Sequence, residues 1–131
     1  MQSSASITPQ EYAAISSIHA GLLPIIRLTT KTNPLPLSMV LSLLLVAKHP
    51  GKTVRELAKM ADISPNSASR LLNDLSDTNS FGGAGYGLIE RRVDDHDQRY
   101  MKAYLSEKGR ALVRQIAGEM DRSRRPVREA A

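Results

Sequence analysis

The stretch Thr53–Asp77 reads TVRELAKMADISPNSASRLLNDLSD and predicts two short helices joined by a tight turn. Its first four residues, Thr53–Glu56, have the pattern of a capping box. In that motif the threonine hydroxyl accepts a backbone N–H, and the glutamate three residues later returns the bond. Asp62-Ile63 predicts the turn, and Ser64-Pro65 predicts a helix start with a capping serine and a proline at the first helical position.

The second of these helices, predicted at Pro65–Ser76, has one apolar and one polar face. Its apolar residues recur at the i, i+3, i+4, i+7 spacing of a buried stripe: Ala68, Leu71, Leu72 and Leu75. At about 100° per residue the polar residues fall on the other side: Asn66, Ser69, Arg70, Asn73 and Asp77. Asn and Arg pair bidentately with adenine and guanine edges, so the stretch predicts a helix-turn-helix that reads duplex DNA. A helical hairpin with a solvated polar face is the alternative.

The composition is that of one folded domain, with 131 residues, 41% of them hydrophobic, and no cysteine. The missing cysteines exclude disulfides and cysteine-ligated zinc. Met1–Ser6 is too short and polar to be a signal peptide, and the apolar run Leu35–Ala47 is too short to span a bilayer. We therefore expect a cytoplasmic protein with no membrane association. The net charge of +5 favours an anionic partner.

Basic residues cluster in and next to the first helix of the pair, at Lys52, Arg55 and Lys59. The second helix, Pro65–Ser76, has a single basic residue, Arg70. We therefore expect phosphate contacts from the flanks and base reading from neutral polar groups.

Two further helices are predicted before the pair. Thr8–Glu11 is a second capping box, and Pro24 predicts a kink or an end in the helix that it opens, because proline lacks an N–H. Residues 37–48 are apolar nearly all round, which indicates the central buried helix.

After the pair, the glycines of Thr78–Tyr86 predict a flexible loop. Leu88–Val93 and Arg99–Leu105 predict two strands around the polar tip Asp94–Gln98, the pattern of a wing. Ser106 then predicts the start of a last helix.

These elements predict a mainly α fold with a small β-hairpin wing, a winged helix-turn-helix, in a single domain of residues 1–131. Within it we expect an N-terminal dimerisation helix (8–33), a winged helix-turn-helix core (36–105), a C-terminal helix (106–122) and a basic tail (123–131). The first and last helices carry more apolar surface than a small domain needs, which predicts a homodimer interface. Its residues would be Ile15, Ile18, Leu22, Ile25, Leu112, Ile116 and Met120.

No motif indicates catalysis, a cofactor or a metal. Asp94–Asp97 is interpreted as a solvated hairpin tip, because no second group of ligands is placed to meet it. The serines at 64, 67 and 69 lack a His/Asp partner pattern, and Gly82–Gly87 lacks the strand-before, helix-after setting of a phosphate loop. We expect neither an enzyme nor a bound cofactor.

The segment Leu35–Val113 resembles the MarR family of winged helix-turn-helix regulators. The resemblance rests on four stretches in order: VRELA at 54–58, ISPNSASRLL at 63–72, GLIERR at 87–92 and LSEKGRALV at 105–113. It implies a bacterial or archaeal homodimer that represses transcription from a palindromic operator, with Pro65–Ser76 in the major groove and the wing near the minor groove. It also implies a small aromatic effector, which in many members enters a cleft between the dimerisation and DNA-binding parts.

Three features depart from the family pattern. His96 stands where the wing commonly carries arginine, and Asp77–Tyr86 contains an insertion of about eight residues. Too few residues follow Arg122 for the family's last helix. A protein-interaction or assembly module of a replication or partition complex is the alternative function. The predicted DNA-contacting residues are Lys52, Thr53, Arg55, Lys59, Ser64, Pro65, Asn66, Ser67, Ser69, Arg70, Asn73, Arg91, His96 and Arg99.

Overall fold

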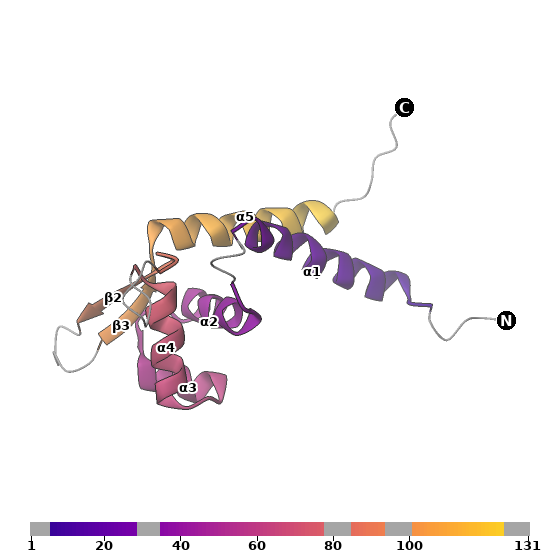
Figure 1. The fold of residues 1–131 in the computed structure, drawn as a ribbon. Coiled ribbons are helices and arrows are strands. Elements are labelled where there is room, and N and C mark those ends of the chain that lie inside the picture. The colour runs from indigo at the N-terminus through magenta and orange to yellow at the C-terminus, as the bar shows by residue number, and fades with distance from the viewer. Residues whose placement is uncertain (1–5, 29–34, 78–84, 94–100, 125–131) are drawn as a thin grey trace.

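Figure 1 shows the fold in a computed structural model, which describes residues 6–28, 35–77, 85–93 and 101–124. Helices and a small antiparallel sheet make up these residues, so the predicted mainly helical fold with a β wing is confirmed. In chain order the elements are α1 (Pro9–Leu28), α2 (Leu37–Lys48), β1 (Lys52–Thr53), α3 (Val54–Ala61), α4 (Pro65–Leu75), β2 (Ile89–Val93), β3 (Met101–Leu105) and α5 (Glu107–Arg124).

The sheet has three strands in the order β1-β3-β2. Strands β2 and β3 pair from Ile89 opposite Leu105 to Val93 opposite Met101, which is the stem of the predicted wing. Strand β1 was not predicted. It has two residues, too few to show an alternating pattern, and Lys52 pairs with Ala103, which is far away in the sequence. This pairing joins the start of the helix-turn-helix to the wing.

The local signals of the helix-turn-helix are confirmed. The Thr53 hydroxyl accepts the Glu56 N–H at 3.3 Å, and Glu56 Oε1 accepts the Thr53 N–H at 3.1 Å. Asp62 ends α3 in the left-handed region with φ 56°. Ser64 Oγ then accepts the Ser67 N–H at 3.1 Å and caps α4. The second predicted capping box is also present, with Glu11 N 3.1 Å from Thr8 Oγ1.

The core lies where α2, α4 and the sheet meet. Leu43, Val46, Leu75 and Leu88 have no solvent-exposed surface. The helix predicted at 37–48 to be the central buried one, α2, does supply core residues, but its burial is one-sided, because Leu41 keeps 59% of its surface exposed. A run of apolar residues shows that a helix can be buried, and only the neighbouring helices decide how much of it is covered.

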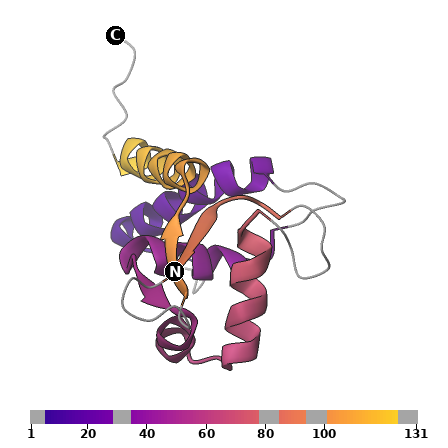
Figure 2. The same cartoon turned by 90° about the vertical axis from the view of Figure 1, so that its left-hand side faces the viewer.

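Helix α1 packs against α5, at the opposite end of the molecule from α3 and α4 (Figures 1 and 2). The helix does not end at Pro24 but continues to Leu28. Proline removes one N–H from the helical ladder, and the burial of Pro24 and Ile25 offsets this loss. The two helices come close at Gly21, where an added Cβ would lie 2.8 Å from Met120 Cγ.

The predicted flexible loop Thr78–Tyr86 is only partly described, and residues 78–84 lie outside the described ranges. The prediction is wrong for Tyr86, which is 8% exposed and belongs to the core. Its N–H donates to the Asp74 carbonyl at 3.0 Å. Gly85 lies so close to α4 that a Cβ there would be 1.9 Å from the Ser76 carbonyl oxygen. These contacts hold Gly85 and Tyr86, the residues that lead into the wing, against the C-terminal end of α4.

Candidate nucleic-acid interface

Helix α4 runs along one side of the molecule, with α3 beside its N-terminal end (Figure 2). Its inner face, formed by Ala68, Leu72 and Leu75, is buried in the core. The predicted DNA-contacting residues at its start are all exposed, as is Arg70 one turn later: Ser64, Pro65, Asn66 and Ser67. Because its inner face is anchored in the core, α4 presents a row of short polar side chains and one guanidinium to solvent.

The cations of α3 form the second part of this surface. Arg55 and Lys59 are exposed, and Lys52 Nζ lies 3.6 Å from Glu56 Oε2. Both partners of this ion pair are about half exposed, so the pair adds little stability and the ammonium remains accessible to a phosphate. Thr53 is different. Its hydroxyl is used within the capping box, where it also lies 3.1 Å from Glu56 Oε1.

Asn73 and Arg91 contact each other, which the sequence did not predict. Arg91 Nη1 donates a hydrogen bond to Asn73 Oδ1 and so links α4 to β2. Burial lowers the pKa of the Arg91 guanidinium, because the charged form loses solvation. An amide oxygen has two lone pairs, so this bond orients the Asn73 side chain without removing its capacity to accept a second hydrogen bond. Ser69, on the same side of α4, is half-buried.

The described part of the wing is the β2–β3 stem. The Arg92 guanidinium carbon lies 4.6 Å from the centre of the Tyr104 ring, and Arg92 Nη2 lies 3.0 Å from Glu90 Oε2. The predicted DNA-contacting residues His96 and Arg99 lie outside the described residues, as does the acidic tip Asp94–Asp97.

The residues predicted for the dimer interface fall into two groups. Ile25, Leu112 and Ile116 are less than 9% exposed and form part of the core of the chain itself, so they offer little surface to a second copy. Helical periodicity identifies an apolar face, but it does not say whether the same chain covers that face. Met120 is half-buried. The remaining residues are exposed, together with Ile26, which the prediction missed: Ile15, Ile18 and Leu22.

Among the described residues, no three His, Asp or Glu side chains are grouped so that they could hold a metal ion. None of the helices in the described residues combines the length and the apolar character that crossing a bilayer requires.

No protein-family model and no curated protein sequence matches the chain. Solved structures do match its fold. The transcriptional regulator Tm0710 from Thermotoga maritima aligns over 86% of this chain and 70% of its own, with TM-score 0.63 and 15% identity. A MarR transcriptional regulator from Methanosarcina mazei aligns over 86% and 72%, with TM-score 0.59 and 17% identity. FabT from Streptococcus pneumoniae, solved in complex with DNA, aligns over 87% and 71%, with TM-score 0.59 and 18% identity. The chain therefore has the winged helix-turn-helix fold of the MarR transcriptional regulators.

Proposed function

We propose that the protein is a transcriptional regulator that binds duplex DNA sequence-specifically. The observation that carries this proposal is the exposed polar edge of α4. Ser64, Asn66, Ser67 and Arg70 face solvent from a helix whose other side is anchored in the core. A helix held in this way enters a major groove without losing internal contacts. The likeness to FabT, which was solved with DNA, supports the same use of the fold.

In this proposal α4 contacts the bases, and the cations of α3 contact the phosphates. Asn66 and Arg70 read base edges, and the exposed serines at the start of α4, Ser64 and Ser67, contact a phosphate. Lys52, Arg55 and Lys59 on or next to α3 neutralise backbone phosphates on the flank. Arg91 orients α4 through Asn73. The tip of the wing, with His96 and Arg99, approaches the minor groove.

The second part of the proposal is a homodimer that represses transcription from a palindromic operator in the cytoplasm. Residues 8–33 and 106–122 would then serve dimerisation, and residues 36–105 would serve DNA binding. The exposed apolar side of α1 supports this division, because Ile15 and Ile18 are each more than half exposed. A small aromatic effector, as the MarR resemblance implies, completes the proposal.

A selection of bound fragments from random duplex DNA tests the proposal. A palindromic motif with half-sites about one helical turn apart is the expected result. Replacing Lys59 with Gln should then weaken binding to all sequences about equally and reduce the salt slope by roughly one, since one phosphate contact is lost. If no sequence is enriched and duplex binding shows no salt dependence, the regulator is ruled out in favour of the assembly module.

A further inference from the structure

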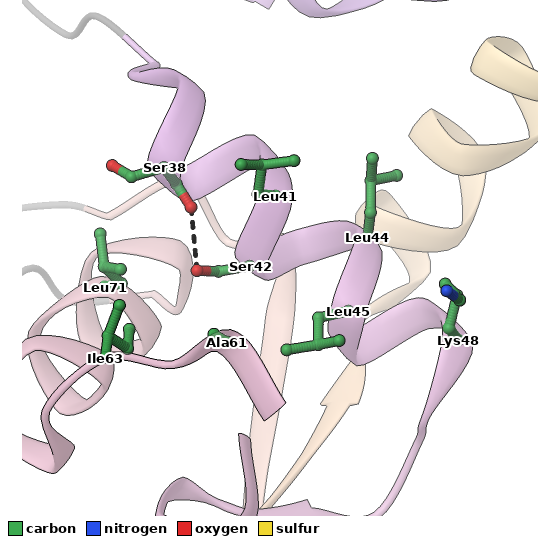
Figure 3. Close-up of a pocket in the computed structure, with 9 residues that line it drawn as sticks. All are labelled: Ser38, Leu41, Ser42, Leu44, Leu45, Lys48, Ala61, Ile63 and Leu71. Atoms are coloured by element: carbon green, nitrogen blue, oxygen red, sulfur yellow. Dashed lines mark hydrogen bonds between the residues drawn. The ribbon is translucent and has the colours of Figure 1, made fainter. Parts of the chain in front are cut away.

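An apolar hollow of about 440 Å³ lies along the outer side of α2. Figure 3 shows its lining, which comes from α2, from the end of α3 and the turn that follows it, and from α4. Its nine lining residues are Ser38, Leu41, Ser42, Leu44, Leu45, Lys48, Ala61, Ile63 and Leu71. The volume is within the range of small-molecule sites, which is about 300–1,000 Å³. No residue of α1 lines the hollow, so it is separate from the proposed dimer face on that helix.

The lining leaves large apolar groups in contact with water. Leu41 is 59% exposed and Ile63 is 36% exposed, although both sit beside core residues. The Ser42 hydroxyl donates to the Ser38 carbonyl oxygen at 2.9 Å within α2 (Figure 3), and Ser38 is itself exposed, so its hydroxyl can stay in contact with water. An apolar body in the hollow would therefore remove hydrocarbon from water without burying an unsatisfied hydroxyl.

One charge marks an end of the hollow. Lys48, the last residue of α2, lines it, and the described residues that line it include no carboxylate. Within the described part of the chain, Lys48 forms no ion pair. Ser38 and Lys48 are ten residues apart, which is roughly 15 Å along a helix. The hollow is thus elongated and apolar, and it has a cation at one end.

We infer that the hollow binds a small alkyl carboxylate, with the alkyl chain along α2 and the carboxylate at the Lys48 ammonium. We assign an alkyl body because the hollow extends along α2 and its apolar lining consists of Leu, Ile and Ala side chains. The ligand is anionic because the one charged group of the lining is a cation. Ala61, Ile63 and Leu71 place this ligand against the turn of the helix-turn-helix and against α4.

The test uses octanoate and its uncharged counterpart 1-octanol, titrated into the full chain without DNA. Methyl NMR is expected to show saturable octanoate binding with Kd below about 1 mM, and shifts confined to Leu41, Leu44, Leu45, Ile63 and Leu71. Octanol should bind several-fold more weakly. No saturable octanoate binding, or shifts that lie elsewhere, would overturn the site. Octanol binding as tight as octanoate would overturn the assignment of the ligand as an anion.

Variants separate the two ends of the site. Lys48→Gln should weaken octanoate binding about two- to fivefold, as loss of an exposed ion pair predicts, and leave octanol binding unchanged. Arg114→Gln, on the exposed side of α5, is the matched control and should change neither. Ala61→Phe should fill the hollow and abolish the binding of octanoate and of octanol. If Ala61→Phe does not fold, Leu41→Ser replaces it, because Leu41 is exposed, and this variant should weaken the binding of both ligands. Unchanged octanoate binding in Lys48→Gln, or in both pocket variants, would contradict the inference. Since DNA is absent, this failure would leave the proposed function standing.

Discussion

At the scale of single residues, Arg70 and Arg91 show how two arginines of one surface take different roles. Arg70 is exposed on α4, whereas Arg91 is partly buried and hydrogen-bonded to Asn73. We therefore expect substitution of Arg70 to change DNA binding, and substitution of Arg91 to change first how α4 is held.

Arg70→Ala should weaken specific duplex binding by about 1–3 kcal/mol, because a base contact of the recognition helix is lost. The free energy of unfolding should change by less than about 0.5 kcal/mol, since the side chain is exposed. Fluorescence anisotropy on the selected operator and on a random duplex measures both affinities. An equal loss on the two duplexes would show that Arg70 contacts phosphate alone.

The bond between Asn73 and Arg91 should appear as a coupling energy in the stability of the free protein. Asn73→Ala and Arg91→Met, alone and together, form a double-mutant cycle followed by urea unfolding. A charged hydrogen bond in a partly buried setting predicts a coupling of about 1–2 kcal/mol. Additive effects of the two changes would show that the bond contributes nothing to the position of α4.

At the scale of elements, α3 depends on its capping box. Glu56 accepts the backbone N–H and the hydroxyl of Thr53, and these bonds hold the pKa of the Glu56 carboxyl below its ordinary value of 4.5. A lowered pKa in the folded state means that the folded protein favours the charged carboxylate. The resulting stabilisation is fully present above pH 4.5 and is lost as the pH falls through the lowered pKa.

Thr53→Ala should therefore destabilise the protein by about 1 kcal/mol at neutral pH, because the N-cap of α3 is lost. The difference in melting temperature between wild type and variant should shrink as the pH is lowered from 7 to 3. In Glu56→Gln the amide accepts hydrogen bonds but does not titrate. The difference in melting temperature between wild type and this variant should therefore also shrink as the pH is lowered. Thermal unfolding followed by circular dichroism measures both. A difference that stays constant across this range would contradict the role of the Glu56 charge.

At the scale of the whole molecule, α1 packs through one side against the described part of the chain. Its contacts with α5 include Ser17, whose hydroxyl accepts the Arg124 Nε–H at 3.2 Å, and the close approach at Gly21. The other side leaves Ile15, Ile18 and Ile26 each more than half exposed. A contiguous apolar strip of this kind on a helix is typical of a surface that is covered in an assembly.

The double variant Ile15→Asp/Ile18→Asp should convert a homodimer into a folded monomer, since two charges would be buried without partners. Sedimentation at micromolar concentration measures the change, and operator affinity should fall along with it. Leu37→Asp is the matched control, because Leu37 is 65% exposed but lies on α2. A monomeric wild-type chain would refute the proposed dimer and its palindromic operator.

The sequence by itself determined the elements whose causes are local. Capping boxes, the turn at Asp62-Ile63 and the apolar stripe of α4 all depend on residues within one or two helical turns. Only the tertiary structure decided which surfaces meet. The two-residue strand β1, the burial of Tyr86 against α4 and the Asn73–Arg91 bond join residues far apart in the chain. Periodicity shows that a face is apolar, but its partner is chosen by packing. For that reason Ile25 belongs to the core while Ile18, on the same helix, stays exposed.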